Sequence, residues 1–219
     1  MNIDKLLRQA DYFCKLATSS EALPEDSKEL KTILSNLEGL ESYNARKKYA
    51  ENNLKHLSSG SSRIVYKTSD GTIIKLAKND KGLAQNKAEC NPKMKSKFLN
   101  KVIDHAKDYC WMQTHYLDKI TAKEFEKMTG LNFDEFGDAI GYGLKTISGN
   151  KDREKPENFD EVSKSEIYRE LTRIGKQCKL MPGDLSRISS WGTKDGKPVL
   201  IDAGLTKDVY DKFYDDPSS

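Results

Sequence analysis

The sequence predicts an α+β fold in which a group of short β-strands precedes a mostly helical half. Short apolar runs typical of strands lie between residues 57 and 117, bounded by turn residues. From residue 121 to residue 180, apolar residues recur instead at the three- and four-residue steps of helices. A chain of 219 residues is long enough for one domain with a core, or for one domain with a helical extension. We therefore expect a single active centre.

Composition excludes several classes of function. Hydrophobic residues make up 36% and charged residues 32% of the chain, which is typical of an ordered globular protein. The net charge of +3 is spread along the chain, so nothing indicates a nucleic-acid partner. Stretches of about 18 apolar residues are absent, and we expect no membrane association. The cysteines Cys14, Cys90, Cys110 and Cys178 lack zinc-site spacing, so we expect reduced thiols and a cytoplasmic location.

The N-terminal residues 1–55 are expected to form a helical extension. Apolar residues from Ile3 to Ala17 lie on one helical stripe, the pattern breaks over residues 19–27, and a second helical pattern runs from Leu30 to Leu40. Such a stripe can dock a partner or lie on a membrane surface. Packing against the chain's own core is the commoner use, and we expect it here.

The next segment predicts strands around one helix. Residues 64–66 and 72–76 form a hairpin around the turn Asp70-Gly71. Residues 82–100 are compatible with a helix that bears Glu89 and is interrupted by Pro92. Two more strands are expected at residues 98–103 and 109–117, on either side of a polar turn at residues 104–108.

Helical patterns dominate the rest of the chain. Thr121 and Glu124 have the spacing of a capping box, which predicts a helix beginning there. After a polar linker at residues 149–160, a longer helix is expected over residues 163–180. A short apolar strand at residues 197–201 follows a turn at Asp195-Gly196.

Three segments, in order, resemble the protein-kinase-like superfamily, including small-molecule kinases of the aminoglycoside phosphotransferase type. The first is Leu-Ser-Ser-Gly-Ser-Ser-Arg-Ile-Val-Tyr at residues 57–66 together with Lys75. The others are Gly-Asp-Leu at residues 183–185 followed by Trp-Gly at 191–192, and Leu-Ile-Asp-Ala-Gly at residues 200–204. The resemblance covers about residues 55–207 and implies a two-lobed kinase-like fold. Its β-rich N-lobe would span residues 56–117, and its reduced helical C-lobe residues 118–219.

The resemblance implies roles for residues of the N-lobe. Lys75 would contact the α- and β-phosphates of ATP, and Glu89 would pair with it. The glycine-rich loop and the connection between the lobes would hold the rest of the nucleotide, through Gly60, Ser61 and Ser62 over the phosphates and Tyr116 and Leu117 beside the adenine. Each residue also has a purely structural interpretation. The loop can be a serine-rich hairpin turn, Lys75 a solvent-facing strand residue and Glu89 an exposed helical residue.

The resemblance also implies two catalytic carboxylates in the C-lobe. Asp184 would accept the proton of the attacking hydroxyl, and Asp202 would bind the Mg²⁺ that bridges the phosphates. Ser189 stands where the family has a metal-binding asparagine, and its hydroxyl would be a weaker second ligand. Either aspartate alone is also a common turn former after an apolar run.

The resemblance implies ATP- and Mg²⁺-dependent phosphoryl transfer to a hydroxyl acceptor, either a small molecule or a protein. A pseudokinase, which keeps the fold and binds a nucleotide or a partner with little catalysis, is the main alternative because of Ser189 and the single loop glycine, Gly60. A helical interaction protein with an incidental Gly-Asp-Leu is a third interpretation. Only 15 residues follow Gly204, too few for the activation segment and the helices with which ordinary protein kinases dock a peptide.

Overall fold

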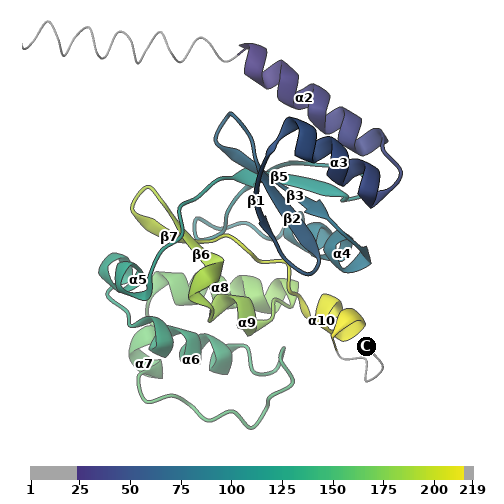
Figure 1. The fold of residues 1–219 in the computed structure, drawn as a ribbon. Helices are drawn as coiled ribbons and strands as arrows, with labels where there is room; N and C mark the ends of the chain where they lie inside the picture. Colours follow the sequence, from purple (N-terminus) through teal and green to yellow (C-terminus); the bar gives the residue numbers. More distant parts are fainter. Residues whose placement is uncertain (1–23, 215–219) are drawn as a thin grey trace, which may run out of the picture.

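The protein has the expected two-lobed α+β architecture, seen here in a computed structural model that describes residues 24–214. A β-sheet with helices on it forms the upper lobe in Figure 1, and a helical lobe with a small hairpin lies below it. The helix expected at residues 2–17 lies outside the described residues. None of the helices within residues 24–214 is long and apolar enough to cross a membrane.

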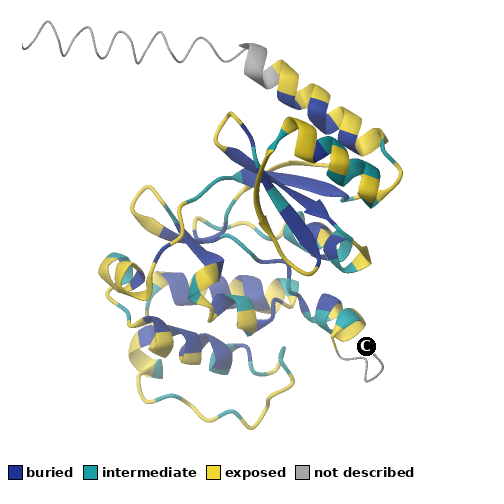
Figure 2. Ribbon diagram, in the orientation of Figure 1, coloured by how far each residue is buried: buried dark blue, intermediate teal, exposed yellow. Residues whose placement is uncertain are grey.

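The N-lobe is built on a five-stranded antiparallel sheet with strand order β1-β2-β3-β5-β4. The predicted hairpin is confirmed as β2 and β3. Edge strand β1 is exposed along its length, whereas β3 is buried on both faces, as Figure 2 shows. The elements of this lobe are α2 (Pro24–Gly39), α3 (Tyr43–Asn53), β1 (Lys55–Ser59), β2 (Arg63–Lys67), β3 (Thr72–Ala77), α4 (Asp80–Glu89), β4 (Val102–His105) and β5 (Trp111–His115).

Helix α2 contains the second predicted helical pattern and packs against one face of this sheet. The packing expected for the stripe from Ile3 to Ala17 lies outside the described residues. In α2, Leu37 is fully buried in a cluster with Tyr66 of β2 and Ile74 of β3. Because side chains alternate between the two faces of a strand, the neighbouring positions Val65 and Lys75 point to the opposite face. That face lines the cleft between the lobes.

The C-lobe has its own core around Phe125, Phe136 and Trp191, whose rings pack with centroid separations of 5.1 to 5.9 Å. The capping box of Thr121 and Glu124 is confirmed. The elements of this lobe are α5 (Ala122–Thr129), α6 (Phe133–Gly143), α7 (Phe159–Val162), α8 (Glu166–Cys178), α9 (Pro182–Leu185), the 3₁₀ turn η1 (Ile188–Ser190), β6 (Trp191–Lys194), β7 (Lys197–Leu200) and α10 (Lys207–Phe213).

Some predicted boundaries were wrong. Helix α4 begins at Asp80 and ends at Glu89, before Pro92, so it does not continue towards residue 100. The strand expected at residues 98–103 begins only at Val102, because Phe98 and Leu99 are buried against the C-lobe. Leu99 forms an isolated bridge with Leu200, so this segment ties the sheet to the β6–β7 hairpin.

Candidate functional site: a charged cleft between the lobes

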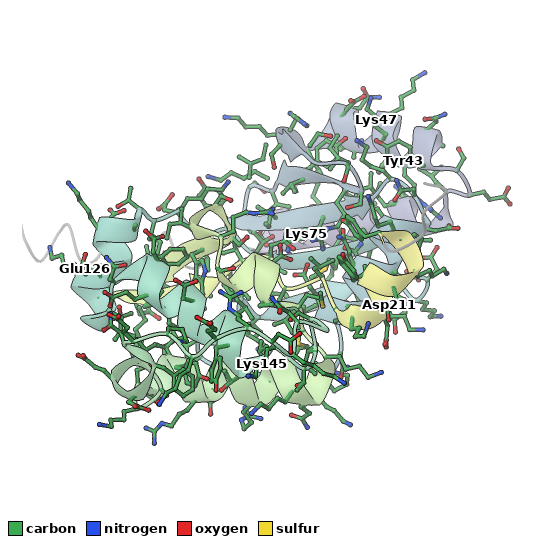
Figure 3. All side chains as sticks on the ribbon, turned by 90° about the horizontal axis from the view of Figure 1, so that it is seen from below. Tyr43, Lys47, Lys75, Glu126, Lys145 and Asp211 are labelled. Atoms are coloured by element: carbon green, nitrogen blue, oxygen red, sulfur yellow. The ribbon has the colours of Figure 1, made fainter. Side chains whose placement is uncertain are left out.

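Lys75 and Glu89, which the family resemblance predicts to form an ion pair, lie next to each other in the interior. Lys75 is only 5% exposed, and its Nζ lies 2.8 Å from Oε2 of Glu89. The same Nζ donates a hydrogen bond to the backbone carbonyl of Ile201, also at 2.8 Å. Figure 3 shows Lys75 in the middle of the molecule, far from Lys47 at its outer end. The solvent-facing interpretation of Lys75 is therefore wrong, and its ammonium group joins β3, α4 and the end of β7.

Asp202 lies directly after β7 and faces this ion pair. Its side chain remains 46% exposed, so a ligand in the cleft can reach it. Burial among protein groups would raise the pKa of Asp202, but the positive charges of Arg63 and Lys75 outweigh that effect and hold it well below its usual range. Asp202 is thus an ionised carboxylate at any physiological pH.

Gly204 allows the segment after Asp202 to lie close to α4. A Cβ atom at this position would come within 2.9 Å of Cβ of Gln85 and 3.2 Å of the Glu89 carboxylate. A larger residue would push the segment away from the helix that carries Glu89. The glycine of the Asp-Ala-Gly motif therefore has a packing role here, which brings Asp202 next to the Lys75–Glu89 pair.

Asp184 reaches the cleft from the single helical turn α9. The turn is anchored by Leu185, which is fully buried and whose carbonyl accepts a hydrogen bond from Nε1 of Trp191 at 3.0 Å. Burial raises the pKa of Asp184 to about 6, and the nearby charge of Asp202 adds to that shift. A carboxylate with this pKa is mostly ionised at neutral pH, yet more basic than a free aspartate.

Two adjoining cavities form one cleft along these residues. The larger, about 600 Å³, runs from Val65, Ile73 and Leu117 to the charged end at Asp202. The smaller, about 480 Å³, lies under the loop at residues 58–62. Both cavities are lined by Lys75, Asp184, Arg187 and Asp202. One end of the cleft is thus largely apolar, and the other carries the ionised groups.

The loop at residues 58–62 forms hydrogen bonds with neighbouring residues. The backbone N–H of Gly60 donates to the carbonyl of Arg63 at 2.8 Å, and the hydroxyl of Ser62 donates to Oε1 of Gln85 at 2.5 Å. Ser61 is exposed and also borders the smaller cavity. Its carbonyl accepts a hydrogen bond from Nδ2 of Asn79 at 3.4 Å. All three loop residues predicted to cover phosphates therefore have internal partners in this structure, and their role towards a ligand stays a prediction.

The remaining predicted residues also line the cleft. Ser189 lies on the 3₁₀ turn after Asp184, on the wall of the larger cavity. Tyr116 and Leu117 follow β5 at the apolar end. The backbone N–H of Tyr116 donates to the carbonyl of Gly71, whereas no hydrogen bond within residues 24–214 uses the backbone N–H of Leu117. Leu117 is thus the better-placed backbone donor for a ligand.

Asp202, Asp184 and Ser189 offer oxygen ligands of the kind that a magnesium ion takes. Mg²⁺ bound with a nucleotide takes one or two protein carboxylates and completes its shell with phosphates and water. Asp202 is ionised and exposed to the cleft, and Asp184 and Ser189 line the same cavity. The part of the chain that the structure describes contains no group of three or more His, Cys, Asp or Glu suited to a metal. The residues present would fit an ion whose shell is completed by phosphates and water, and Asp202 would be its main protein ligand.

Sequence reasoning missed Arg63, which lies at the centre of the charged end. Its guanidinium group is 7% exposed and forms ion pairs with Glu89, through Nη1, and with Asp202, through Nη2 at 2.5 Å. A signal was present in the sequence. Arg63 precedes Val65 by two residues, so it lies on the same face of β2, and Val65 is opposite Lys75 in the sheet.

Comparisons with known proteins give only distant likenesses. No family model matches the chain, and no curated protein matches it significantly. Similar solved structures are of aminoglycoside phosphotransferases. One is the streptomycin–ATP–APH(2″)-IIa ternary complex, 14% identical over 78% of this chain and 74% of that chain, with a TM-score of 0.36. Another is ADP-bound APH(2″)-Ib, also 14% identical, over 76% and 73%, with a TM-score of 0.37. Such likeness carries no function over to this chain.

The raised pKa of Asp184 predicts a pH-dependent stability. The pKa of Asp184 is about 6 in the folded state and lies above the ordinary aspartate value of 3.8, which applies to the unfolded chain. The folded state therefore loses stability as the pH rises through 6. Asp184→Asn removes this charge, so we expect its free energy of unfolding, relative to wild type, to increase by about 1 kcal/mol between pH 5 and pH 8. Urea unfolding at both pH values measures the change.

Asp195→Asn is the control for this experiment. It removes the same charge from the exposed turn between β6 and β7, where water screens it. We expect its effect on stability to vary little with pH. The raised pKa of Asp184 would be contradicted if the free energy of unfolding of Asp184→Asn, relative to wild type, stays constant or falls from pH 5 to pH 8.

Proposed function

We propose that the chain binds ATP in the cleft and transfers its γ-phosphoryl group to a hydroxyl acceptor. One observation carries this proposal: Lys75, Asp202 and Asp184, from three separate segments, line the same cavity. A phosphotransferase needs a cation for the phosphates, a carboxylate for the metal and a carboxylate for the acceptor hydroxyl. In the cleft, Lys75, Asp202 and Asp184 can fill these three roles in that order.

The apolar end of the cleft suits the base of the nucleotide. Val65 and Ile73 come from the sheet and Leu117 from the segment after β5, and together they can enclose a flat ring. The free backbone N–H of Leu117 can donate to a ring nitrogen. A nucleotide held there directs its phosphates towards Lys75, at the other end of the same cavity.

At the charged end, each residue has one task. Lys75, held by Glu89, neutralises the phosphates. Asp202 would hold a magnesium ion, which would supply positive charge to stabilise the phosphoryl group in the transition state. Asp184 accepts the proton of the acceptor hydroxyl while the hydroxyl oxygen forms a bond to the γ-phosphorus. The bond from that phosphorus to the bridging oxygen breaks, and ADP leaves with the electron pair.

A second candidate is a nucleotide-binding protein without turnover, and two observations favour it. Ser189 offers only a neutral hydroxyl as a second metal ligand. In addition, the guanidinium group of Arg63 already occupies one oxygen of Asp202. Both candidates require nucleotide binding, so binding and turnover are tested separately.

For binding, we expect ATP to raise the melting temperature of the protein. A ligand that binds only the native state adds about 2.7 kcal/mol of stability at 100 times its Kd. Lys75→Ala should weaken ATP affinity about 10-fold or more, because it removes a charge-assisted contact with the phosphates. Thermal-shift titrations with ATP, ADP and GTP measure both effects.

The control is Lys47→Ala, on the exposed surface of α3 and far from the cleft (Figure 3). It should bind ATP like wild type. If millimolar ATP, with or without Mg²⁺, leaves the melting temperature of wild type unchanged, both candidate functions are wrong.

For turnover, Asp184→Asn is the decisive variant. A general base contributes mainly to the transition state, so the variant should bind ATP nearly as well as wild type. Its rate of ATP hydrolysis should fall by about 10²-fold or more. Release of ³²P-phosphate from labelled ATP gives the rate, and Asp195→Asn should match wild type. If wild type releases phosphate no faster than Asp184→Asn, the second candidate, a nucleotide-binding protein without turnover, is favoured.

A further inference from the structure

Arg63 is a buried cation at the phosphate end of the cleft. Its guanidinium group contacts Glu89 and Asp202, and its Nη1 donates a third hydrogen bond to Oδ1 of Asn86 at 3.3 Å. A guanidinium group has five N–H donors and stays protonated in proteins. Among residues 24–214, three of these donors have acceptors, and one donor on Nε and one on Nη2 have none. Arg63 also lines the smaller cavity, so this residue borders the cleft.

The loop is built to hold Arg63 in this place. The backbone carbonyl of Ser62 accepts a hydrogen bond from the N–H of Lys78 at 2.8 Å, and Arg63 itself pairs with Ala77 in the sheet. Gly82 permits this approach, because a Cβ atom there would lie 2.2 Å from the Ser62 carbonyl oxygen. The backbone at Arg63 is thus held by contacts with β3 and α4.

The charges of this cluster balance without a metal ion. Arg63 and Lys75 carry two positive charges, and Glu89 and Asp202 carry two negative charges. Without Arg63, the Asp202 carboxylate would face incoming phosphates uncompensated and would repel them. Arg63 removes this repulsion, and Arg also suits phosphate because its planar fork can donate two hydrogen bonds at once.

We infer that Arg63 does at this site part of what a divalent cation does for a nucleotide: it neutralises Asp202 and donates to the phosphates. Nucleotide binding should therefore depend little on Mg²⁺. This inference rests on the proposed nucleotide site and names a further phosphate-binding residue in it. It also accounts for Ser189, since a site with an internal cation has less need of a second strong metal ligand.

The test is the affinity for a non-hydrolysable ATP analogue, AMP-PNP, measured by isothermal titration calorimetry in EDTA and in Mg²⁺. For wild type, we expect the two Kd values to agree within about 3-fold, because the internal cation acts in both buffers. Arg63→Gln should weaken binding in EDTA by about 10-fold or more, the scale of a lost charge-assisted contact. Mg²⁺ should restore part of that loss.

Arg46→Gln is the matched control, because Arg46 is also ion-paired and largely buried, with a side chain that is 13% exposed beside Asp108. It should bind AMP-PNP like wild type in both buffers. Circular dichroism confirms that each variant is folded. If Arg63→Gln does not fold, the comparison of wild type in the two buffers decides alone.

Two results overturn the inference. One is wild-type affinity that falls more than about 10-fold in EDTA, and the other is a folded Arg63→Gln variant that binds like wild type in EDTA. If AMP-PNP binds only in Mg²⁺, the proposed function stands, but Arg63 does not replace a divalent cation at this site. No binding in either buffer would instead remove the proposed function itself.

Discussion

A cluster of four ion-paired side chains, three of them largely buried and the fourth, Asp202, partly exposed, organises the cleft. Lys75, Glu89, Arg63 and Asp202 come from β3, α4, β2 and the segment after β7, so their ion pairs join the sheet to its helix and to the C-lobe. Burying charges costs free energy that only close pairing can offset, and removing one partner of such a pair costs about 3–5 kcal/mol. The segments that carry these charges are therefore constrained to stay together, which holds the functional groups in place before any ligand binds.

The rest of the site follows from this constraint through close packing. Gly82 and Gly204 let the loop before β2 and the segment after β7 approach α4, where a Cβ atom would collide with them. In the C-lobe, the buried Trp191 holds the turn that carries Asp184 through a hydrogen bond to Leu185. The apolar end and the charged end of the cleft are thus positioned by the two cores of the molecule, one in each lobe.

Much of this arrangement could be predicted from the sequence, because local patterns encode it. The hairpin around Asp70-Gly71 and the capping box at Thr121 depend on neighbouring residues, and both are confirmed. The late start of β4 was missed because Phe98 and Leu99 are buried by the C-lobe, a contact that no local pattern shows. Arg63 was missed for a related reason: its partners lie 26 and 139 residues away in the chain. The alternation of side chains along β2, which puts Arg63 on the same face as Val65, is the only local pattern that could have indicated its position.

A crystal structure with bound AMP-PNP tests the central claim most directly, because it locates the phosphates. We expect phosphate oxygens within about 3 Å of Nζ of Lys75 and of the guanidinium group of Arg63. We also expect the base against Leu117. A nucleotide bound elsewhere, or phosphates in the cleft that contact neither Lys75 nor Arg63, would contradict the central claim.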